Sequence, residues 1–343
     1  MKVSARRLDD ARQGDWEAFV DTCAQATFFH RAGWRTVLEK AYGHATYYLY
    51  AERDGRISGV LPLGHIRSRL FGNVLISTPF CVYGGVAADD ESSARALEDA
   101  ACDLARELRV DHLELRNREP RNPDWLGKDL YVTFRKTIDP DPERNLLAVP
   151  RKQRAMIRKG IKSGLRSSID DDTDAFYAIY ADSVHRLGTP VFPRRYFRLL
   201  KDTFGVACEI TRVTAPDGRD VSAVLSFRFR DEILPYYGGG LQAARQLAGY
   251  DFLYWEVMRR ACERGCRVFD YGRSKRGTGS LSFKKNWGFE PEPLHYRFQL
   301  VRASSVPDVN PLNPKYRLFI DAWKRMPLWL ANALGPMIAR DLG

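Results

Sequence analysis

The sequence has little of what metal or disulfide chemistry requires. Its six cysteines are scattered over 343 residues, and only Cys262 and Cys266 lie close together. That spacing matches neither a zinc framework nor a disulfide scaffold. A Ser-His-Asp order, metal-ligand spacing and a phosphate-binding P-loop are missing as well. We therefore expect no metal site and no P-loop chemistry.

Long apolar runs are also missing. The first residues, Met1 to Arg7, lack the apolar stretch of a signal peptide. No segment approaches the roughly 18 uncharged apolar residues that a membrane-spanning helix needs. The expected location is therefore the cytoplasm.

What the chain does have is core-forming material and positive charge. Hydrophobic residues make up 44% and aromatic residues 12% of a chain that is long for a single core, so we expect two domains. The formal net charge of +11 should attract an anionic partner: a nucleotide cofactor, tRNA, an anionic glycan or a lipid. Charge alone does not choose among these, and a basic but unspecialised surface stays open as the alternative.

Two parts of the sequence repeat the same order of elements. The glycine turns that begin at Tyr83 and at Tyr237 each follow a turn and a strand, and each precedes a helix and an acidic strand. The distance from Tyr83 to Glu114 is nearly that from Tyr237 to Asp270. This repetition predicts two α/β halves that arose by duplication, with chance similarity of two α/β segments as the alternative.

The stretch Asp139-Pro140-Asp141-Pro142-Glu143 is rich in proline and acid and suits a linker. We predict an N-terminal domain at residues 1–142, a C-terminal domain that carries the chemistry at residues 143–303, and a helical tail at residues 304–343. The second copy alone has a basic glycine loop after its acidic strand. The first half is therefore expected to have a structural or acceptor-side role.

The tail starts with a proline-interrupted run, residues 310–314, and continues as an amphipathic segment with Trp323 and Trp329. Pro327 and Pro336 interrupt that segment. Packing across the two halves is therefore favoured over a helix on a membrane surface.

The run Arg245-Gln246-Leu247-Ala248-Gly249-Tyr250-Asp251 precedes a helix predicted over Asp251 to Arg264. Unpaired backbone N–H groups and the positive end of a helix together suit a pyrophosphate. Gln246 and Gly249 are the candidate phosphate-loop residues. The Asp251 carboxylate would repel phosphate, and it is alternatively a helix N-cap.

Two further segments concentrate cations. The loop after Asp270 reads Gly-Arg-Ser-Lys-Arg-Gly-Thr-Gly and puts cations and N–H groups at the end of a strand, where anions bind in open α/β sheets. A flexible basic loop is the alternative. Residues 150–166 carry many cations and few acids, which suits a phosphate clamp or simply a solvated helix face. His185 is a conceivable base, or else structural.

Four runs together resemble the FemA/FemB-related proteins of the exosortase (PEP-CTERM) and exopolysaccharide systems: residues 269–291, 150–160, 236–240 and 254–256. The similarity extends over nearly the whole chain. It implies an α/β (α+β) fold of two tandem GNAT-like domains, each with a mixed, mostly antiparallel central sheet flanked by helices. It also implies transfer of an acyl or aminoacyl group to an amine or hydroxyl of a cell-envelope or exopolysaccharide precursor.

The resemblance also suggests the donor. Acyl-coenzyme A is the expected co-substrate, with no cofactor bound permanently, and Gln246, Gly249, Gly238 and Gly239 would hold it. Aminoacyl-tRNA is the alternative donor, although residues 170–215 leave no room for the long helical hairpin of the tRNA-dependent relatives. A noncatalytic glycan- or nucleotide-binding module is the other alternative. DNA is not an expected partner, and peripheral membrane contact stays open.

The implied mechanism works by orientation. A β-bulge N–H near Tyr237 would hold the developing oxyanion, while a tyrosine, Asp270 or a water chain relays the proton. The catalytic candidates are Asp270, Tyr237 and Tyr254. The candidate ligands of donor or acceptor phosphates, or of an anionic glycan precursor, are Arg273, Ser274, Lys275, Lys284, Lys285, Arg151, Arg154 and Arg158.

Overall fold

A computed structural model describes residues 3–68, 71–306 and 314–342. The chain forms two compact units, described separately below. Unit 1 comprises Met1–Asp129, Pro293–Val309 and Ala339–Gly343, and unit 2 comprises Leu130–Glu292 and Asn310–Ile338. The chain thus changes unit at residue 130 rather than at 143, and the domain boundaries drawn from the linker stay a prediction. Residues 307–313 of the predicted tail lie outside the described residues.

Unit 1 is built on a mixed sheet with the strand order β1-β2-β3-β4-β6-β17-β7, and β5 pairs with β3. Only β4 and β6 run parallel, and the other pairs are antiparallel. Its strands are β1 (Ser4–Arg7), β2 (Ala45–Arg53), β3 (Arg56–Ser68), β4 (Gly72–Ser77), β5 (Ala87–Ala88), β6 (His112–Asn117), β7 (Leu126–Gly127) and β17 (His295–Leu300).

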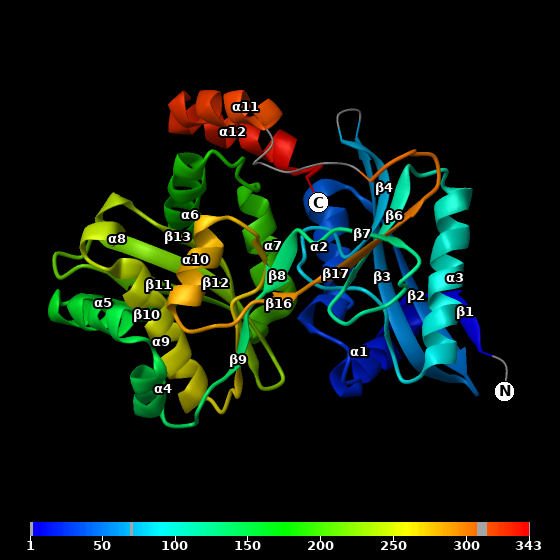
Figure 1. Cartoon of the computed structure of the whole chain (residues 1–343), viewed down its shortest axis with the longest axis horizontal. Coiled ribbons are helices and arrows are strands. Elements are labelled where there is room, and N and C mark those ends of the chain that lie inside the picture. The colour runs from blue at the N-terminus through cyan, green and yellow to red at the C-terminus, as the bar shows by residue number, and fades with distance from the viewer. Residues whose placement is uncertain (1–2, 69–70, 307–313, 343) are drawn as a thin grey trace. The chain divides into compact units, whose positions relative to one another are not determined.

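Helices cover both faces of this sheet (Figure 1). The helices are α1 (Gln13–Thr22), α2 (Gly33–Tyr42) and α3 (Glu91–Glu107). Helix α3 buries Leu97, Ala101 and Leu104 against the sheet. Helices α1 and α2 lie on the other side.

Unit 2 contains a sheet with the order β10-β11-β12-β13-β14-β9 and a small sheet β15-β8-β16. In the large sheet only β13 and β14 run parallel. The strands are β8 (Tyr131–Thr133), β9 (Arg135–Thr137), β10 (Arg166–Asp170), β11 (Cys208–Thr214), β12 (Asp220–Phe229), β13 (Glu232–Gly240), β14 (Val268–Asp270), β15 (Ser274–Lys275) and β16 (Glu292–Pro293).

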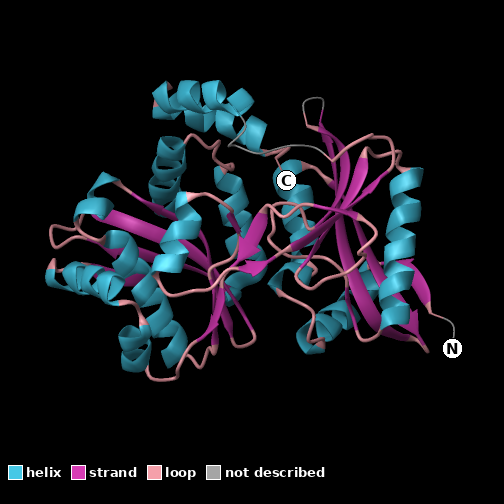
Figure 2. Ribbon diagram, viewed as in Figure 1, coloured by secondary structure: helices cyan, strands magenta, loops and turns pink. Residues whose placement is uncertain are grey.

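The helices of unit 2 also lie on two sides of its sheet, as Figure 2 shows. Consecutive glycines of β13 face them alternately: Gly238 faces Tyr254 of α9, and Gly239 faces Tyr180 of α6. The helices are α4 (Pro142–Ala148), α5 (Arg151–Lys162), α6 (Thr173–Leu187), α7 (Arg194–Phe204), α8 (Gln242–Gln246), α9 (Gly249–Glu263), α10 (Gly279–Asn286), α11 (Pro314–Arg325) and α12 (Leu328–Ala339).

Each sheet takes one strand from a distant part of the sequence. In unit 1, β17 pairs with β6 along the whole of His112–Asn117, although it follows the second repeat. In unit 2, β9 pairs with β14, although it precedes the repeat. The predicted mixed, mostly antiparallel sheet with flanking helices is confirmed in both units. Among the described residues, no helix combines the length and the apolar character needed to span a bilayer.

Candidate active site

Two strands of unit 2 separate in the middle of its sheet. β13 and β14 are paired only through Glu232 with Val268 and Ile233 with Phe269. β13 nevertheless continues to Gly240 and stays paired with β12 on its other side. A register shift there leaves one extra residue, Tyr236, on β13, which is a β-bulge. The predicted bulge thus lies beyond the point where the two strands separate.

Tyr254 of α9 lies against the backbone of β13 in this split. A Cβ added to Gly238 would be 2.8 Å from Tyr254 Oη, so only glycine lets the strand approach the hydroxyl so closely. Burial raises the pKa of Tyr254 above its ordinary value. The phenol is therefore protonated at neutral pH and serves as a hydrogen-bond donor.

A second tyrosine stands beside the first. The rings of Tyr254 and Tyr271 are 5.0 Å apart, and Phe283 of α10 lies 5.6 Å from Tyr254. Tyr271 Oη is buried without a hydrogen-bond partner among the described residues, and burial raises its pKa. A buried donor without a partner is costly unless a ligand or water satisfies it. The split is therefore apolar in its walls and offers phenol donors.

Lys284 of α10 closes the end of β14. Its Nζ donates to the backbone carbonyls of Tyr271 at 2.7 Å, Gly272 at 2.9 Å and Arg273 at 3.0 Å. Burial lowers the pKa of Lys284 to about 7, opposed by the charge of Asp270. An ammonium has three protons, and these contacts use all of them. Lys284 thus positions the loop, and the phosphate contact predicted for it stays a prediction that its present bonds do not support.

Asp270 lies at the end of β14 and is fully buried. Its carboxylate accepts hydrogen bonds from Arg135 Nη1 and from the Gly272 N–H, both at 2.7 Å. Arg135 also binds Glu232 of β13. The three side chains therefore connect β9, β13 and β14 just before the strands separate. This arrangement suits a positioning role, and proton transfer by Asp270 stays a prediction.

The basic loop after β14 gathers around one ring. The charged groups of Arg273 and Lys275 lie 4.6 and 5.5 Å from the centre of the Tyr131 ring. Ser274 is buried, with its Oγ 2.9 Å from Ser280 Oγ. Lys285 is exposed on α10. Arg273 and Lys275 are thus brought together, whereas Ser274 points into the fold.

The start of α9 has no side-chain cap. Its N-cap residue is Ala248, in the left-handed conformation with φ 56°. The first amides, those of Gly249 and Tyr250, have no acceptor within the helix. A Cβ on Gly249 would be 2.5 Å from Val221, so this glycine packs the helix start against β12. Gln246 lies just before it, exposed at the end of α8.

The N-cap alternative for Asp251 is wrong, because helix α9 begins two residues earlier. Asp251 is buried, and its Oδ1 accepts hydrogen bonds from Gln153 and Trp287, both at 3.0 Å. Burial raises its pKa. The carboxylate therefore ties α5 to the first turn of α9.

Helix α5 packs on α9 through one face and leaves its cations outside. Gly160 lies where a Cβ would be 2.7 Å from Phe252. Arg151 and Arg158 are exposed, Arg154 is half-buried, and none of the three forms an ion pair with another described residue. The three arginines are thus free to meet an anion beside the start of α9.

Tyr237 lies on the opposite face of β13 from Tyr254. Its hydroxyl is 2.8 Å from that of Tyr196, within a cluster of aromatic rings from α6 and α7. The structure therefore separates two of the predicted catalytic residues. His185 Nε2 contacts the carbonyl of Trp323 at 3.1 Å, which supports the structural interpretation of this histidine.

Two residues of the site could not be predicted from the sequence. Arg135 meets Asp270 across 135 positions of sequence, and no pattern in the sequence connects them. Tyr271 lies within the run 269–291 that resembles the FemA/FemB-related proteins, but its sequence context predicts no role for it. Among the described residues, no group of three or more His, Cys, Asp or Glu side chains could hold a metal ion.

Residues 151–285 match the family model described as "Acetyltransferase (GNAT) domain". The match runs from α5 to α10 and so contains the strand split, the start of α9 and Lys284. No curated protein sequence matches the chain.

Solved structures are similar over nearly the whole chain. FemX is 14% identical with a TM-score of 0.69, covering 93% of this chain and 100% of FemX. A tandem GNAT protein from the clavulanic acid biosynthesis pathway is 15% identical with a TM-score of 0.54, covering 89% and 100%. The C-terminal domain of a putative lysylphosphatidylglycerol synthetase from Agrobacterium fabrum is 12% identical with a TM-score of 0.56, covering 84% and 91%. The predicted tandem GNAT-like fold is confirmed, and the exosortase link stays a prediction.

Proposed function

We propose that unit 2 is an acyltransferase of the GNAT/FemAB type that takes its acyl group from a coenzyme A thioester. The observation that carries this proposal is that β13 leads from the strand split to the uncapped start of α9. A thioester in the split would meet phenol donors, and its pyrophosphate would meet the amides of Gly249 and Tyr250. Helix α5 packs on the first turn of α9 through Gln153 and Gly160, and its cations lie on its exposed face.

In the transfer step, an acceptor amine or hydroxyl attacks the thioester carbonyl, a C–N or C–O bond forms, and the C–S bond breaks. Tyr254, kept protonated by burial, donates its proton to the departing thiolate. The proton lost by the acceptor passes to water, and water returns a proton to Tyr254 before the next turnover. Asp270, Arg135 and Lys284 hold the strand ends in place, so that catalysis comes mainly from orientation.

The acceptor is proposed to be a cell-envelope or exopolysaccharide precursor, handled in the cytoplasm. This rests on the resemblance of the run from Phe269 to Pro291 to the exosortase-associated proteins. FemX and the lysylphosphatidylglycerol synthetase domain share the fold, which is compatible with a large polar acceptor.

A second donor, aminoacyl-tRNA, is favoured by the outer face of α5. Arg151, Lys152, Arg158, Lys159 and Lys162 are exposed there, and none forms an ion pair with another described residue. Residues 170–215 form α6, α7 and β11, and the two helices pack on the sheet of unit 2.

The deciding experiment is calorimetric titration of the full chain with coenzyme A, acetyl-coenzyme A and bulk aminoacyl-tRNA, at low and at physiological salt. Saturable coenzyme A binding that survives physiological salt supports the thioester donor. Binding of tRNA alone transfers the assignment to the aminoacyl reaction. Binding of neither leaves a noncatalytic module and overturns the proposal.

A further inference from the structure

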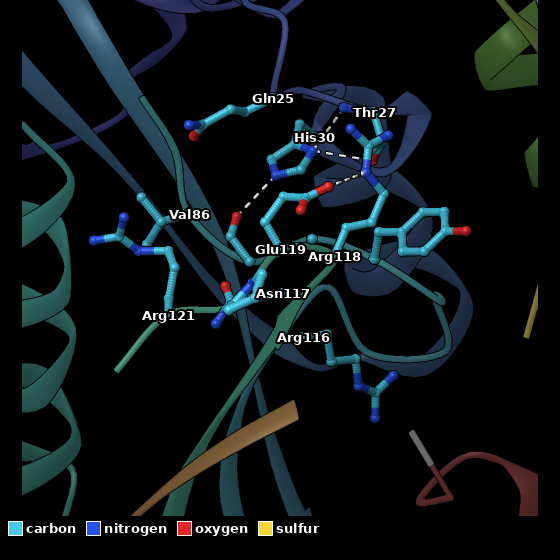
Figure 3. A pocket seen from close by; sticks show the side chains of 13 residues that line it. Gln25, Thr27, His30, Val86, Arg116, Asn117, Arg118, Glu119 and Arg121 are labelled. Atoms are coloured by element: carbon cyan, nitrogen blue, oxygen red, sulfur yellow. Dashed lines mark hydrogen bonds and ion pairs between the residues drawn. The ribbon is translucent and has the colours of Figure 1, made fainter. Parts of the chain in front are cut away.

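Unit 1 has a strand split of its own. β4 and β6 pair only over Val74–Ile76 and His112–Glu114. Beyond that point Ser77 Oγ accepts the Arg116 N–H at 2.7 Å, and the Gly85 N–H donates to the Arg116 carbonyl at 3.0 Å. A cavity of about 130 Å³ lies here, and Figure 3 shows its lining side chains, from residues 83–86 and 116–121 and from Gln25, Thr27 and His30.

Asn117 lines this cavity and is 3% exposed. Neither Nδ2 nor Oδ1 of its amide has a hydrogen-bond partner among the described residues. A Cβ on Gly85 would be 1.9 Å from Oδ1, so the amide extends over the glycine in the cavity wall. A buried amide with both ends unsatisfied costs free energy, which a ligand with a donor and an acceptor would remove.

The wall beside the amide is held in a fixed shape. His30 Nδ1 accepts the Thr27 N–H at 3.0 Å, so the ring proton is on Nε2, which donates to the Gly85 carbonyl at 2.8 Å. Both ring nitrogens are therefore occupied, Nδ1 by Thr27 and Nε2 by Gly85. His30 is not left as a base.

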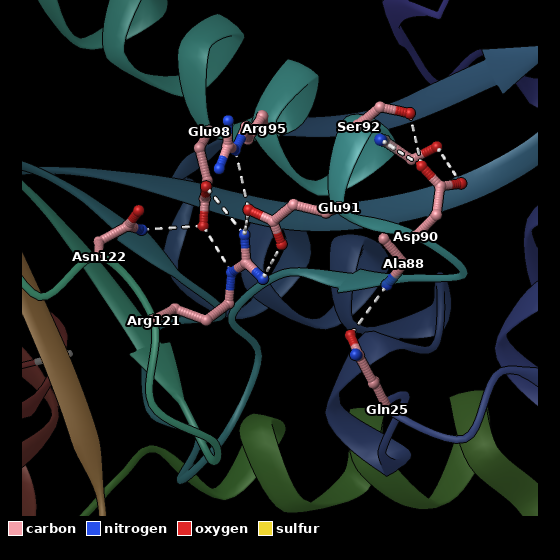
Figure 4. Close-up of polar contacts among 10 residues, drawn as sticks. Gln25, Ala88, Asp90, Glu91, Ser92, Arg95, Glu98, Arg121 and Asn122 are labelled. Carbon is pink, nitrogen blue, oxygen red and sulfur yellow. Dashed lines mark hydrogen bonds and ion pairs between the residues drawn. The ribbon is translucent and has the colours of Figure 1, made fainter.

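The arginines around the cavity are already neutralised. Arg116 donates to Glu114 at 2.8 Å, and Arg118 lies 3.5 Å from Glu119. Arg121 donates to Glu98 at 2.8 Å and to Glu91 at 3.1 Å, the network shown in Figure 4. Arg121 holds the pKa of Glu91 below its ordinary value. Positive charge is thus balanced, which favours a neutral ligand over an anion.

We propose that this cavity binds a neutral, hydroxyl-rich group, a single sugar ring, through the amide of Asn117. Oδ1 accepts a hydrogen bond from one hydroxyl, and Nδ2 donates to the hydroxyl next to it. The volume is well below the roughly 300–1,000 Å³ of pockets for larger ligands, so one ring fits rather than a nucleotide. This proposed binding site does not depend on the proposed transfer reaction, because it is tested by ligand binding alone.

The test is calorimetric titration of the full chain with methyl glucopyranoside, methyl N-acetylglucosaminide and sodium phosphate. We expect saturable binding of at least one glycoside, unaffected by salt, and at least a tenfold loss of affinity in Asn117→Leu. Asn117→Asp, which keeps the size of the side chain, should lose affinity similarly while remaining folded by thermal melting. Asn332→Leu is the matched control, because Asn332 Oδ1 is also buried without a partner but lies in α12.

Three results would overturn the assignment. These are no glycoside binding, stronger binding of phosphate than of either glycoside, or equal glycoside affinity in the Asn117 variants and the wild type. Loss of affinity in the Asn332 control to the same degree would also count against a local site.

A separate observation concerns α12, whose apolar residues face outward. Its small residues Ala331, Gly335 and Ala339 are buried, and a Cβ on Gly335 would be 2.9 Å from the Val191 backbone nitrogen. The large ones face solvent: Trp329 is 71% and Met337 72% exposed. A helix that only packs on its own domain shows the reverse pattern.

We infer that this face of α12, with Leu318 and Phe319 of α11, docks on an anionic membrane surface. Residues 326–339 carry no charge, while Lys324 and Arg325, immediately before them, are exposed and form no ion pair with another described residue. An apolar stripe bordered by cations is typical of helices that lie in a lipid interface. Apolar exposure of this kind otherwise marks a protein contact.

Vesicle flotation tests this docking with the full chain and phosphatidylcholine vesicles, with and without phosphatidylglycerol. We expect flotation with the anionic vesicles, and at least a tenfold loss of the bound fraction in the double variant Trp329→Glu, Met337→Glu. Val206→Glu is the matched control, because Val206 is 84% exposed elsewhere in unit 2. Absence of flotation would overturn the membrane docking, and a stable dimer in light scattering that the double variant dissociates would show a protein contact instead.

Discussion

The two units begin their corresponding helices in opposite ways. In unit 1, α3 is capped by Asp90, whose carboxylate accepts hydrogen bonds from the Ser92 hydroxyl and the Ser93 N–H, and these bonds hold the pKa of Asp90 well below its ordinary value. In unit 2, α9 follows Ala248 and has no side-chain cap. An internal anion thus occupies the first helix start, and the second is open. The fold alone therefore does not create a phosphate site.

The strand splits differ in the same way. In unit 1 the split is lined by a balanced set of ion pairs and one unsatisfied amide, Asn117. In unit 2 it is lined by Tyr254 and Tyr271, with Lys284 across the strand end. The same split therefore suits a neutral polar ligand in one unit and acyl chemistry in the other.

Tyr254→Phe should lower the rate of acyl transfer by about 100-fold or more, the loss typical for removal of a general acid. The ring and its packing against Gly238 remain, so affinity for coenzyme A should change little. The measurement is release of free thiol from acetyl-coenzyme A in the presence of acceptor. Tyr237→Phe is the control: this hydroxyl faces Tyr196 on the other side of the sheet, and equal losses in both variants would refute the assignment.

Lys284, in unit 2, should make the stability of the protein depend on pH, and Lys284→Met should remove that dependence. The pKa of Lys284 is lowered from 10.5 to about 7 in the fold. Between these values the unfolded chain binds the extra proton, so this lysine makes the free energy of unfolding rise with pH, by up to about 1.4 kcal/mol per pH unit. Below pH 7 both states are protonated and the contribution is constant.

The measurement is urea unfolding of wild type and Lys284→Met between pH 7 and pH 10, with the difference in unfolding free energy plotted against pH. That difference should increase in favour of the wild type. A flat difference would mean that the lysine keeps an ordinary pKa. Lys285→Met, at an exposed position of the same helix, is the control.

The division of the chain into two related units could largely be predicted from the sequence, because it depends on local pattern. The repeat of glycine turn, helix and acidic strand predicted two related halves, and the loop from Arg245 to Asp251 marked the start of α9. The pairing of β9 with β14 and of β17 with β6 could not be predicted, because no local pattern specifies which sheet a short strand joins. The partners of Asp251 and Asp270 were also missed, because they depend on contacts between residues far apart in sequence.

The directions of the Arg and Lys side chains after Asp270 could not be predicted either. The density of Arg and Lys after Asp270 predicted an anion site without saying where each side chain points. Lys284 points inward to three carbonyls, whereas Lys285, its neighbour, is exposed. Helical spacing fixes which residues share a face, but the sequence does not show which face is buried in so short a helix.

Ala248→Asp would give α9 the cap that α3 has. Aspartate tolerates the left-handed conformation of this position better than most residues, and its carboxylate should occupy the first amides. We expect about a tenfold loss of coenzyme A affinity by calorimetry, and some loss of thermal stability because Ala248 is only 3% exposed. Ala248→Asn, which has a similar shape without the charge, should lose less. Unchanged affinity in Ala248→Asp would place the phosphates elsewhere.

The reverse change, Asp90→Ala, should affect stability alone. It removes the cap of α3 and the ion pair with Arg53 at 2.7 Å, and loss of an N-cap typically costs about 1 kcal/mol. Thermal unfolding should therefore shift down by a few degrees, while coenzyme A affinity stays that of the wild type. A gain of coenzyme A binding sites in this variant would show that Asp90 alone separates the two units. Unchanged binding would show that the tyrosine-lined split of unit 2 is needed as well as an open helix start.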